Sequence, residues 1–268
     1  MTAPATQRQL FAQMPRARIS PFAQWRALTG RTVRTMATKG ELVVAVITPL
    51  VFTIGFYLPL RYVMQFKGID YAQFVMPIIV LQTMSFTMMS NAQLAAFEAM
   101  TGLHSRLQTM PIGQLVPLTS RICAGLVRST TSLIAALIFG YAIGFRFSAG
   151  IGQAVLFCVF SLAVGTVLAI GADALGSLTK SPESLSQALT LPTLILGMLS
   201  CGFAPESAFP SWIRPFARNQ PISQFAYAMR DMAADGVSWH VLWVPLVWLI
   251  GLAVAFVPLA IWASVRRA

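Results

Sequence analysis

Few residues of this chain could perform catalysis or bind a metal ion, and they do not gather into a recognisable site. The sequence holds eight acidic residues, two histidines and three cysteines. His104 and His240 have no acidic or thiol neighbours at the spacing of metal ligands. Ser200 and Cys201 lie in an apolar segment without a nearby base, so nucleophilic catalysis has no support. The sequence therefore predicts neither catalytic residues nor a metal site.

Several charged residues stand inside or beside long apolar segments, where each needs a partner. Arg128 lies nine residues into an apolar run that begins at Thr119, and Arg121 lies seven residues earlier on the same helical face. Glu98 and Asp173 fall near the ends of two other apolar runs and could pair with either arginine. A charge in such surroundings must be paired or must reach the aqueous boundary. We expect one cluster of these four residues, acting either as a structural ion pair or in the working cycle of the protein.

The composition explains why such charges are rare. The chain has 268 residues, of which 56% are hydrophobic and only 10% are charged, against roughly 25% charged residues in an ordinary soluble domain. Its mean hydropathy is +0.70. These values exclude a soluble enzyme, a disordered chain and a collagen-like chain, and they indicate a polytopic membrane protein.

Six apolar segments are long enough to cross a bilayer, which takes about 20 residues per helix. They cover residues 42–60, 72–97, 119–145, 151–175, 185–204 and 241–265. Prolines inside several of them predict bends. Ala136, Gly140 and Gly144 recur every four residues and predict close helix packing, within this chain or against a second one. The expected fold is an all-α membrane protein with six transmembrane helices over residues 41–268, preceded by a basic arm of residues 1–40.

The basic arm carries seven basic residues and no acidic ones, and part of it has a helical pattern. We expect a helix over residues 20–38, with Ser20 as its cap and Pro21 at its first position. Its apolar arc comprises Phe22, Trp25, Thr29, Val33 and Met36, with Arg31 and Arg34 away from the arc and Arg26 at its margin. This pattern is typical of a helix lying in the membrane interface. The alternative is a solvated basic arm.

The basic residues are distributed unequally between alternate connecting segments. One side of the predicted spans holds Arg61, Lys67, Arg146, Arg214, Arg218 and Arg230, and the other thirteen of the 19 basic residues fall on the side of the N-terminus. The positive-inside rule places the richer side in the cytoplasm. We therefore expect a multi-pass protein of the plasma membrane with both termini in the cytoplasm. Because the charge follows the membrane boundary, it does not indicate a nucleic-acid ligand.

Two connecting segments carry more structure than a simple loop needs. The first lies between Glu98 and Pro117, where a short helix with one apolar face is predicted. That face comprises Leu103, Leu107 and Met110, with His104 and Arg106 between them, and Pro111 ends the helix. This short cytoplasmic helix either docks a soluble partner or only packs on lipid.

The second such segment runs from Pro205 to His240 on the outer side. Its aromatic residues and prolines, among them Pro210, Trp212, Pro215 and Pro221, predict one or two short helices that dip into the membrane and return. Phe225, Met229 and Met232 form one helical face that Ser223 could cap. The alternative is an ordinary folded cap.

Several motifs resemble one family, the ABC-2 permeases, which are the membrane subunits of a class of ATP-driven exporters. The matching segments are Phe209-Pro-Ser-Trp212-Ile, Asn219-Gln220-Pro221, Ala228-Met-Arg230, Arg106 to Ile112, Gly144-Phe-Arg146-Phe and Gly55-Phe-Tyr-Leu-Pro59. The wider family usually has Asn directly before Pro, and the intervening Gln220 resembles the daunorubicin-resistance subset. Within that subset the chain is most similar to the B-type permease subunit, which is paired with a C-type permease in the export of drugs or of complex lipids such as phthiocerol dimycocerosates.

The resemblance implies partners as well as a function. The chain has no phosphate-binding loop of the Gly-x-x-x-x-Gly-Lys-Ser/Thr type, so ATP and Mg²⁺ would be bound by a separate ATPase subunit. That subunit would dock on the coupling helix, comprising Glu98, Leu103, His104, Arg106, Leu107, Met110 and Pro111. The external re-entrant segment would include Asn219 and Arg230. The fifth span, with Pro192 and Gly197, would line the path of a hydrophobic or amphiphilic substrate, in contact with membrane lipids.

Two other classes of protein remain as alternatives. An ion-coupled secondary transporter or channel would normally need more polar groups inside the membrane than these spans contain. A membrane-embedded enzyme would gather acidic residues or histidines at one membrane face, and no such group stands out. Dependence of transport on a proton or sodium gradient, without dependence on ATP, would favour the first alternative.

Overall fold

The structure is a computed structural model that describes residues 20–66, 68, 70–101, 116–179 and 181–266. The described part is helical and contains no β-strand, which confirms the all-α fold class. The helices are α2 (Pro21–Thr38), α3 (Glu41–Phe52), a π-helical turn (Thr53–Tyr57), α4 (Leu58–Gln65), α5 (Tyr71–Met100), α7 (Val116–Ala142), α8 (Ile151–Leu178), α9 (Pro182–Met198), a 3₁₀ turn (Glu206–Ala208), α10 (Arg214–Asn219), α11 (Pro221–Ala233) and α12 (Trp239–Arg266).

Five helical stretches are long and apolar enough to cross a membrane. They are Glu41–Gln65, Tyr71–Met100, Val116–Ala142, Ile151–Leu178 and Trp239–Ser264. They correspond to the first, second, third, fourth and sixth predicted spans. The fifth predicted span, residues 185–204, corresponds to α9, which has 17 residues and ends at Met198. The N–H groups of Leu199 and Ser200 still bond to carbonyls of the last turn, but those of Cys201 and Gly202 bond to serine hydroxyls instead of continuing the helix.

Two boundaries differ from the sequence prediction for identifiable reasons. The first span continues to Gln65 through the π-helical turn, which begins four residues after Pro49. In this region the Pro49 carbonyl accepts a 2.7 Å hydrogen bond from the Thr53 hydroxyl. The third span ends at Ala142 rather than at 145, because Gly144 adopts φ = +107° and closes the helix. The Phe145 N–H bonds to Gly140 O at 2.9 Å, and the Gly144 N–H bonds to Tyr141 O, which is the Schellman pattern.

Helix α5 is the centre of the bundle. Of its most apolar stretch, 78% is buried inside the molecule, against 17% for the α3–α4 span and 11% for α12. It packs most extensively along α8, where Gly176 permits the close approach, since a Cβ there would lie 2.3 Å from the carbonyl oxygen of Ala92. Two residues of the predicted small-residue stripe serve packing within this chain: Ala136 is fully buried, and Gly140 faces the Met76 side chain. The third, Gly144, lies in the turn after α7 and has no packing neighbour within 4 Å of the position of a Cβ.

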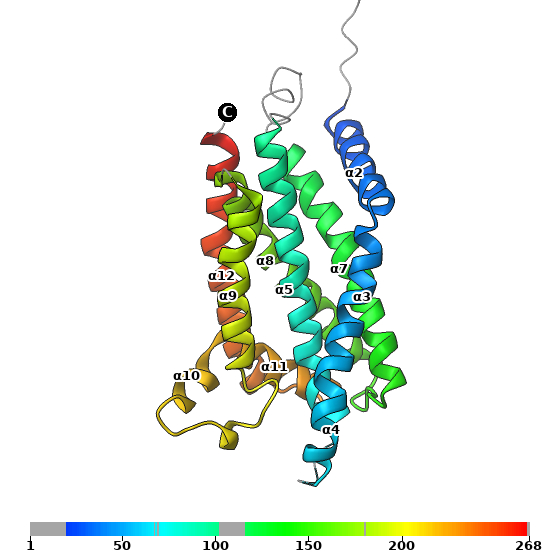
Figure 1. The fold of residues 1–268 in the computed structure, drawn as a ribbon, viewed down its shortest axis with the longest axis vertical. Helices are drawn as coiled ribbons and strands as arrows, with labels where there is room; N and C mark the ends of the chain where they lie inside the picture. The colour runs from blue at the N-terminus through cyan, green and yellow to red at the C-terminus, as the bar shows by residue number, and fades with distance from the viewer. Residues whose placement is uncertain (1–19, 67, 69, 102–115, 180, 267–268) are drawn as a thin grey trace, which may run out of the picture.

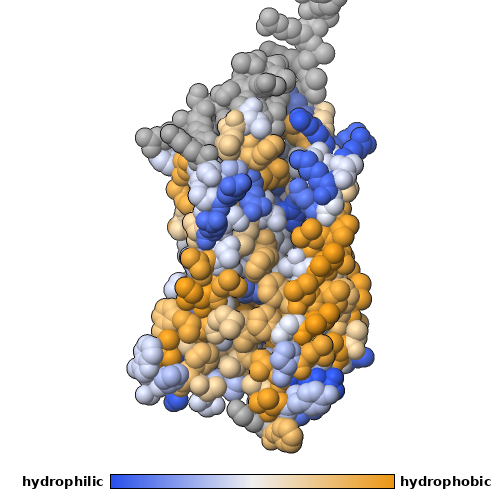
Figure 2. Space-filling view, viewed as in Figure 1, coloured by the Kyte–Doolittle hydropathy of each residue, from blue (hydrophilic) through white to orange (hydrophobic). Residues whose placement is uncertain are grey.

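The bundle has two distinct ends (Figure 1). At one end, here named the α2 end, α3 and α7 begin, α5 and α8 finish, and the last turn of α12 lies. At the other, the α11 end, α11 lies across the bundle and α10 projects beside it. Figure 2 shows hydrophilic residues gathered near both ends and a broad hydrophobic surface between them. Both ends of the described chain lie at the α2 end.

Candidate functional site

A buried ionic triad ties three helices together at the α2 end. Arg121, in the second turn of α7, donates from Nε to Asp173 Oδ1 at 2.7 Å and from Nη2 to Oδ2 at 3.0 Å. Its Nη1 also bonds to Glu98 Oε2 at 3.1 Å. The three side chains are 5–20% exposed. This bidentate geometry links the last turns of α5 and α8 to the first turns of α7.

Arg128 is not part of this triad. It lies two turns further along α7 than Arg121, and it forms an ion pair with Glu41, the first residue of α3. Its side chain is almost wholly buried, and its Nε and Nη1 atoms have no hydrogen-bond partner among the described residues. The predicted four-residue cluster is therefore two neighbouring groups. Sequence reasoning missed Glu41, although it is an acidic residue at the very start of the first span.

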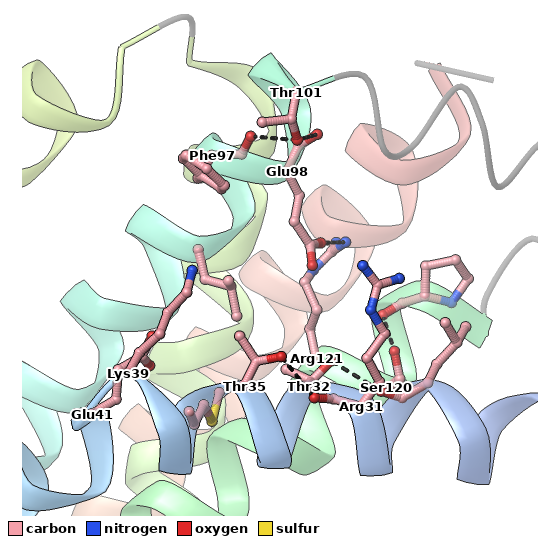
Figure 3. A pocket seen from close by; sticks show the side chains of 14 residues that line it. Arg31, Thr32, Thr35, Lys39, Glu41, Phe97, Glu98, Thr101, Ser120 and Arg121 are labelled. Carbon is pink, nitrogen blue, oxygen red and sulfur yellow. Dashed lines mark hydrogen bonds and ion pairs between the residues drawn. The ribbon is translucent and has the colours of Figure 1, made fainter.

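Helix α2 packs against α7 and forms one wall of a cavity. Ser20 accepts the Ala23 N–H at 3.3 Å as the N-cap of this helix, and Pro21 occupies its first position. Of the predicted apolar arc, Met36 is fully buried, whereas Phe22 is 67% exposed. Arg26, Arg31 and Arg34 are exposed. A cavity of about 240 Å³ lies between α2 and the ends of α5 and α7 (Figure 3).

The predicted coupling helix falls almost entirely outside the described residues. This applies to Leu103, His104, Arg106, Leu107, Met110 and Pro111. The described residue of that set, Glu98, lies in the last turn of α5 and belongs to the ionic triad. The two described residues that flank the segment, Thr101 and Val116, both lie at the α2 end.

At the opposite end, α11 is held by an apolar face. Phe225, Met229 and Met232 are at most 3% exposed and pack into the main core, as their spacing predicts. Pro210, Trp212 and Pro215 lie exposed before α11 in the connecting segment and in α10. Pro221 is the first residue of α11.

The centre of this end is a polar network around Ser223. Contrary to the sequence expectation, Ser223 does not cap α11, which begins at Pro221 with Gln220 at the N-cap position. Its hydroxyl accepts the Cys201 N–H at 3.0 Å and donates to Ala217 O. Gln220, 4% exposed, donates from Nε2 to Leu196 O at 3.1 Å and to Ser223 Oγ at 3.3 Å. Asn219 is exposed, so the buried amide of the Asn-Gln-Pro motif is the inserted glutamine.

Arg230 links α11 to the first turn of α5 through hydrogen bonds to the backbone. Its guanidinium donates to Phe74 O at 3.0 and 3.3 Å and to Gly202 O at 3.3 Å, and it lies 3.7 Å from the centroid of the Phe74 ring. Phe74 lies three residues before Pro77, whose missing N–H weakens this turn of α5. Burial lowers the pKa of Arg230 to about 10, so the group remains charged at neutral pH.

The residues predicted to line a substrate path lie on two sides of α9. Pro192 is exposed, whereas Gly197 is buried against α5, and a Cβ at Gly197 would lie 2.8 Å from Gln82 Oε1. Gln82 itself is 3% exposed in the middle of α5. Among the described residues, no group of three or more His, Cys, Asp or Glu side chains could hold a metal ion.

Comparison with known proteins gives a consistent result. The sequence profile of ABC-2 family transporter proteins matches residues 56–262. The doxorubicin resistance ABC transporter permease protein DrrB of Mycobacterium tuberculosis is 37% identical over 260 residues, which cover 92% of this chain and 90% of that protein. The daunorubicin resistance permease protein DrrB1 of Streptomyces coeruleorubidus is 23% identical over 82% of this chain and 77% of its own length.

A second kind of permease is also similar. The probable doxorubicin resistance permease protein DrrC of M. tuberculosis is 31% identical over 168 residues, which cover 62% of this chain and 60% of that protein. The weaker and shorter match agrees with the sequence motifs, which favour the B-type subunit. From the profile match and the DrrB identity along most of its length, the chain belongs to the ABC-2 family of membrane transporter proteins.

Proposed function

We propose that this chain is the membrane permease subunit of an ATP-driven exporter that moves a hydrophobic or amphiphilic substrate, a drug or a complex lipid, out of the cytoplasm or the inner leaflet. The observation that carries the proposal is the 37% identity to DrrB over 92% of the chain. The apolar character of the spans supports a hydrophobic substrate, because the buried hydroxyls of the central helix, such as those of Ser85 and Thr87, bond to carbonyls of their own helix and do not replace a water shell.

We propose that α9 is the sixth crossing helix. Its 17 residues would span about 25 Å at 1.5 Å per residue, somewhat less than the roughly 30 Å of a bilayer core. Figure 1 shows α9 beside α5 and α12 between the two ends of the bundle. Six crossings place both termini on one side, and the basic residues of α2 favour the cytoplasm for that side.

The substrate path would run along α9. This helix has an exposed apolar face that includes Leu191, Ile195 and Met198. It contacts α5 through Gly197 and through a small apolar cluster that includes Leu185. Gln93 Nε2 donates to Ser186 Oγ at 2.9 Å near the α2 end of this contact. A helix held by few apolar contacts can shift during transport at low cost.

ATP hydrolysis would take place on a separate ATPase subunit, which binds ATP and Mg²⁺. The ionic triad supports a docking site at the α2 end, because Glu98 lies just before the segment of residues 102–115 and Arg121 lies just after it. A movement of this segment on ATPase binding would be transmitted to α5, α7 and α8 together, because Arg121 links these three helices. The simpler alternative is that the triad only stabilises the fold.

A second permease, of the C type, would complete the transport path. The similarity of this chain to both DrrB and DrrC supports a pair of related subunits. Each would place its spans against the other in the membrane. The α3–α4 span and α12 are the least buried of the described membrane helices and have the largest apolar area available for lipid or for this partner.

The test is a mild-detergent pull-down of the tagged chain from its native membrane, followed by an assay of vanadate-sensitive ATPase activity. We expect an ATPase subunit and a second permease to co-purify. Changing Leu103, Leu107 and Met110 together to Asp should abolish recovery of the ATPase. The matched control is Trp212→Asp, a change of an exposed apolar residue at the α11 end, which should leave recovery unchanged.

Recovery of the chain alone, without ATPase activity, in several mild detergents would contradict the exporter function. Transport driven by a proton or sodium gradient and insensitive to vanadate would then support an ion-coupled transporter. Loss of the ATPase from the Trp212→Asp control as well would show that recovery of the ATPase does not report specifically on the segment of residues 103–110.

A further inference from the structure

The cavity at the α2 end has walls of two chemical kinds. Apolar side chains of Leu28, Met36, Leu94 and Phe97 line part of it. Basic side chains lie at its sides: Arg31 belongs to α2, and Lys39 is the residue that follows α2 (Figure 3). Its volume is about 240 Å³, below the roughly 300–1,000 Å³ typical of sites that enclose a drug-sized ligand. The cavity therefore suits a small polar group attached to an apolar body, rather than a whole transported molecule.

The acidic residues that line the cavity are already neutralised. Glu98 is paired with Arg121, and Glu41 is paired with Arg128. Arg31 and Lys39, in contrast, have no carboxylate partner among the described residues, and the Lys39 ammonium lies 5.5 Å from the centroid of the Phe97 ring. The cavity thus presents two free positive charges to a ligand, and α2 itself contains no acidic residue.

The cavity also lies at the level of the membrane boundary. The first span begins at Glu41, α5 ends at Met100 and α7 begins at Val116, and residues near all three points line the cavity. Just beyond Glu41, Val43 and Val44 are more than half exposed on α3. A lipid at this level would place its headgroup beside Arg31 and Lys39 and its acyl chains along an apolar surface.

We propose that this cavity is a binding site for the phosphate-bearing headgroup of an anionic phospholipid, held by Arg31 and Lys39 between α2 and the ends of α5 and α7. The bound lipid would hold α2 against the bundle, beside the ionic triad. The site is distinct from the substrate path along α9, and the proposal depends only on the chain being a membrane protein, so it stands or falls separately from the export function.

The test measures lipid retention by the purified full-length chain in detergent, using native mass spectrometry. The probes are phosphatidylglycerol and phosphatidylcholine with identical acyl chains. We expect Arg31→Gln and Lys39→Gln each to weaken phosphatidylglycerol binding about fivefold, the effect of one basic side chain near an anionic surface. Phosphatidylcholine binding should not change. The matched control is Arg218→Gln, an exposed arginine on α10 at the opposite end, which should leave both lipids bound as before.

Two further arms separate headgroup binding in the cavity from other causes. Leu94→Trp keeps both basic residues but fills the cavity, and it should also release phosphatidylglycerol. Inorganic phosphate at millimolar concentration should not displace the lipid, because it has no acyl chains; displacement by phosphate alone would show that the site binds a free anion and would overturn the lipid proposal.

Equal phosphatidylglycerol retention by the wild-type chain and by the Arg31→Gln, Lys39→Gln double variant would also overturn it. So would an equal loss of both lipids, which would indicate a disturbed detergent belt rather than a headgroup site. If the double variant bound lipid normally but lost a co-purifying ATPase, the two basic residues would belong to a protein interface instead.

Discussion

The two ends of the bundle are held together by different forces. At the α2 end, four helices are joined by charges: Arg121 binds Asp173 and Glu98, and Arg128 binds Glu41. At the α11 end, the joints are an apolar helix face and neutral hydrogen bonds around Gln220 and Ser223. Even the buried cation of that end, Arg230, donates to backbone carbonyls rather than to a carboxylate.

This difference suggests different tasks for the two ends. Ion pairs between helices can be made and broken as whole units, and each carries a large penalty when only one partner is removed. A network of neutral bonds to backbone groups fixes one arrangement when its buried groups are partnered. We therefore interpret the α2 end as the end where the helices change their relative positions, and the α11 end as the end where they keep one arrangement.

The largest predicted effect tests the ionic triad. Arg121→Met removes the shared cation and leaves Glu98 and Asp173 beside each other without a partner. We expect the free energy of unfolding to fall by about 3 kcal/mol, the lower part of the range for breaking a buried pair, because Glu98 is 20% exposed and retains some water. The measurement is SDS-induced unfolding in mixed micelles, followed by loss of helical circular dichroism.

The control for this prediction removes all three charges. The triple variant Arg121→Met, Glu98→Gln, Asp173→Asn contains no unpaired ion and should regain most of the lost stability. If the triple variant still exported substrate at the wild-type rate, the triad would be only structural. A single Arg121→Met variant as stable as the wild type would contradict the difference between the two ends.

The second prediction addresses the neutral network. Gln220→Ala removes the donor to Leu196 O and to Ser223 Oγ inside a buried site. We expect a loss of about 1–2 kcal/mol, as for other buried groups left without a partner, measured by the same unfolding assay. Asn219→Ala changes the neighbouring exposed amide and should cost less than about 0.5 kcal/mol. Equal effects of the two variants would show that the motif acts through its loop geometry rather than through the buried amide.

The sequence alone predicts five of the helices that are long and apolar enough to cross a membrane, because a span needs a long apolar run and few other patterns produce one. It predicts the buried face of α11 from the helical spacing of Phe225, Met229 and Met232. It does not predict where α7 ends, since the Gly144 turn interrupts a run that remains apolar to Phe145. It also does not predict the end of α9, which depends on hydroxyl groups of Ser200 and of Ser223 on another helix.

The pairing of charges is the part of the site that sequence cannot decide. Arg121 and Arg128 lie on one helical face, so either could meet the same carboxylates, and only the packing of α3 against α7 brings Glu41 to Arg128. Gln220 shows the converse problem. In the sequence Gln220 is an extra residue that interrupts the Asn-Pro motif. In the structure its buried amide donates a hydrogen bond to Leu196 O.

The third prediction concerns the cation of the α11 end. Arg230→Lys keeps the charge but cannot reproduce the forked bonds to Phe74 O and Gly202 O. We expect a loss of about 1 kcal/mol, smaller than for Arg121→Met because no carboxylate is left unpaired. Unfolding in mixed micelles measures the loss, and Arg218→Lys, a change of an exposed arginine in α10 of the same segment, serves as the control. A loss equal to that of Arg121→Met would show that both ends depend on charge in the same way.

The smallest predicted effect compares the helix caps of the two ends. Ser20 caps α2 through one exposed 3.3 Å bond to the Ala23 N–H, whereas Asp70 caps α5 at the α11 end, bonding to the Ala72 N–H at 3.1 Å. Because α2 lies outside the central bundle and α5 forms its centre, we expect Ser20→Ala to cost about 0.5 kcal/mol and Asp70→Ala about 1 kcal/mol. Amide hydrogen exchange should show the first loss within α2 alone and the second along α5 and its neighbours. Faster exchange in α5 after Ser20→Ala would mean that α2 is part of the central cooperative unit, and the α2 end would then be as fixed as the α11 end.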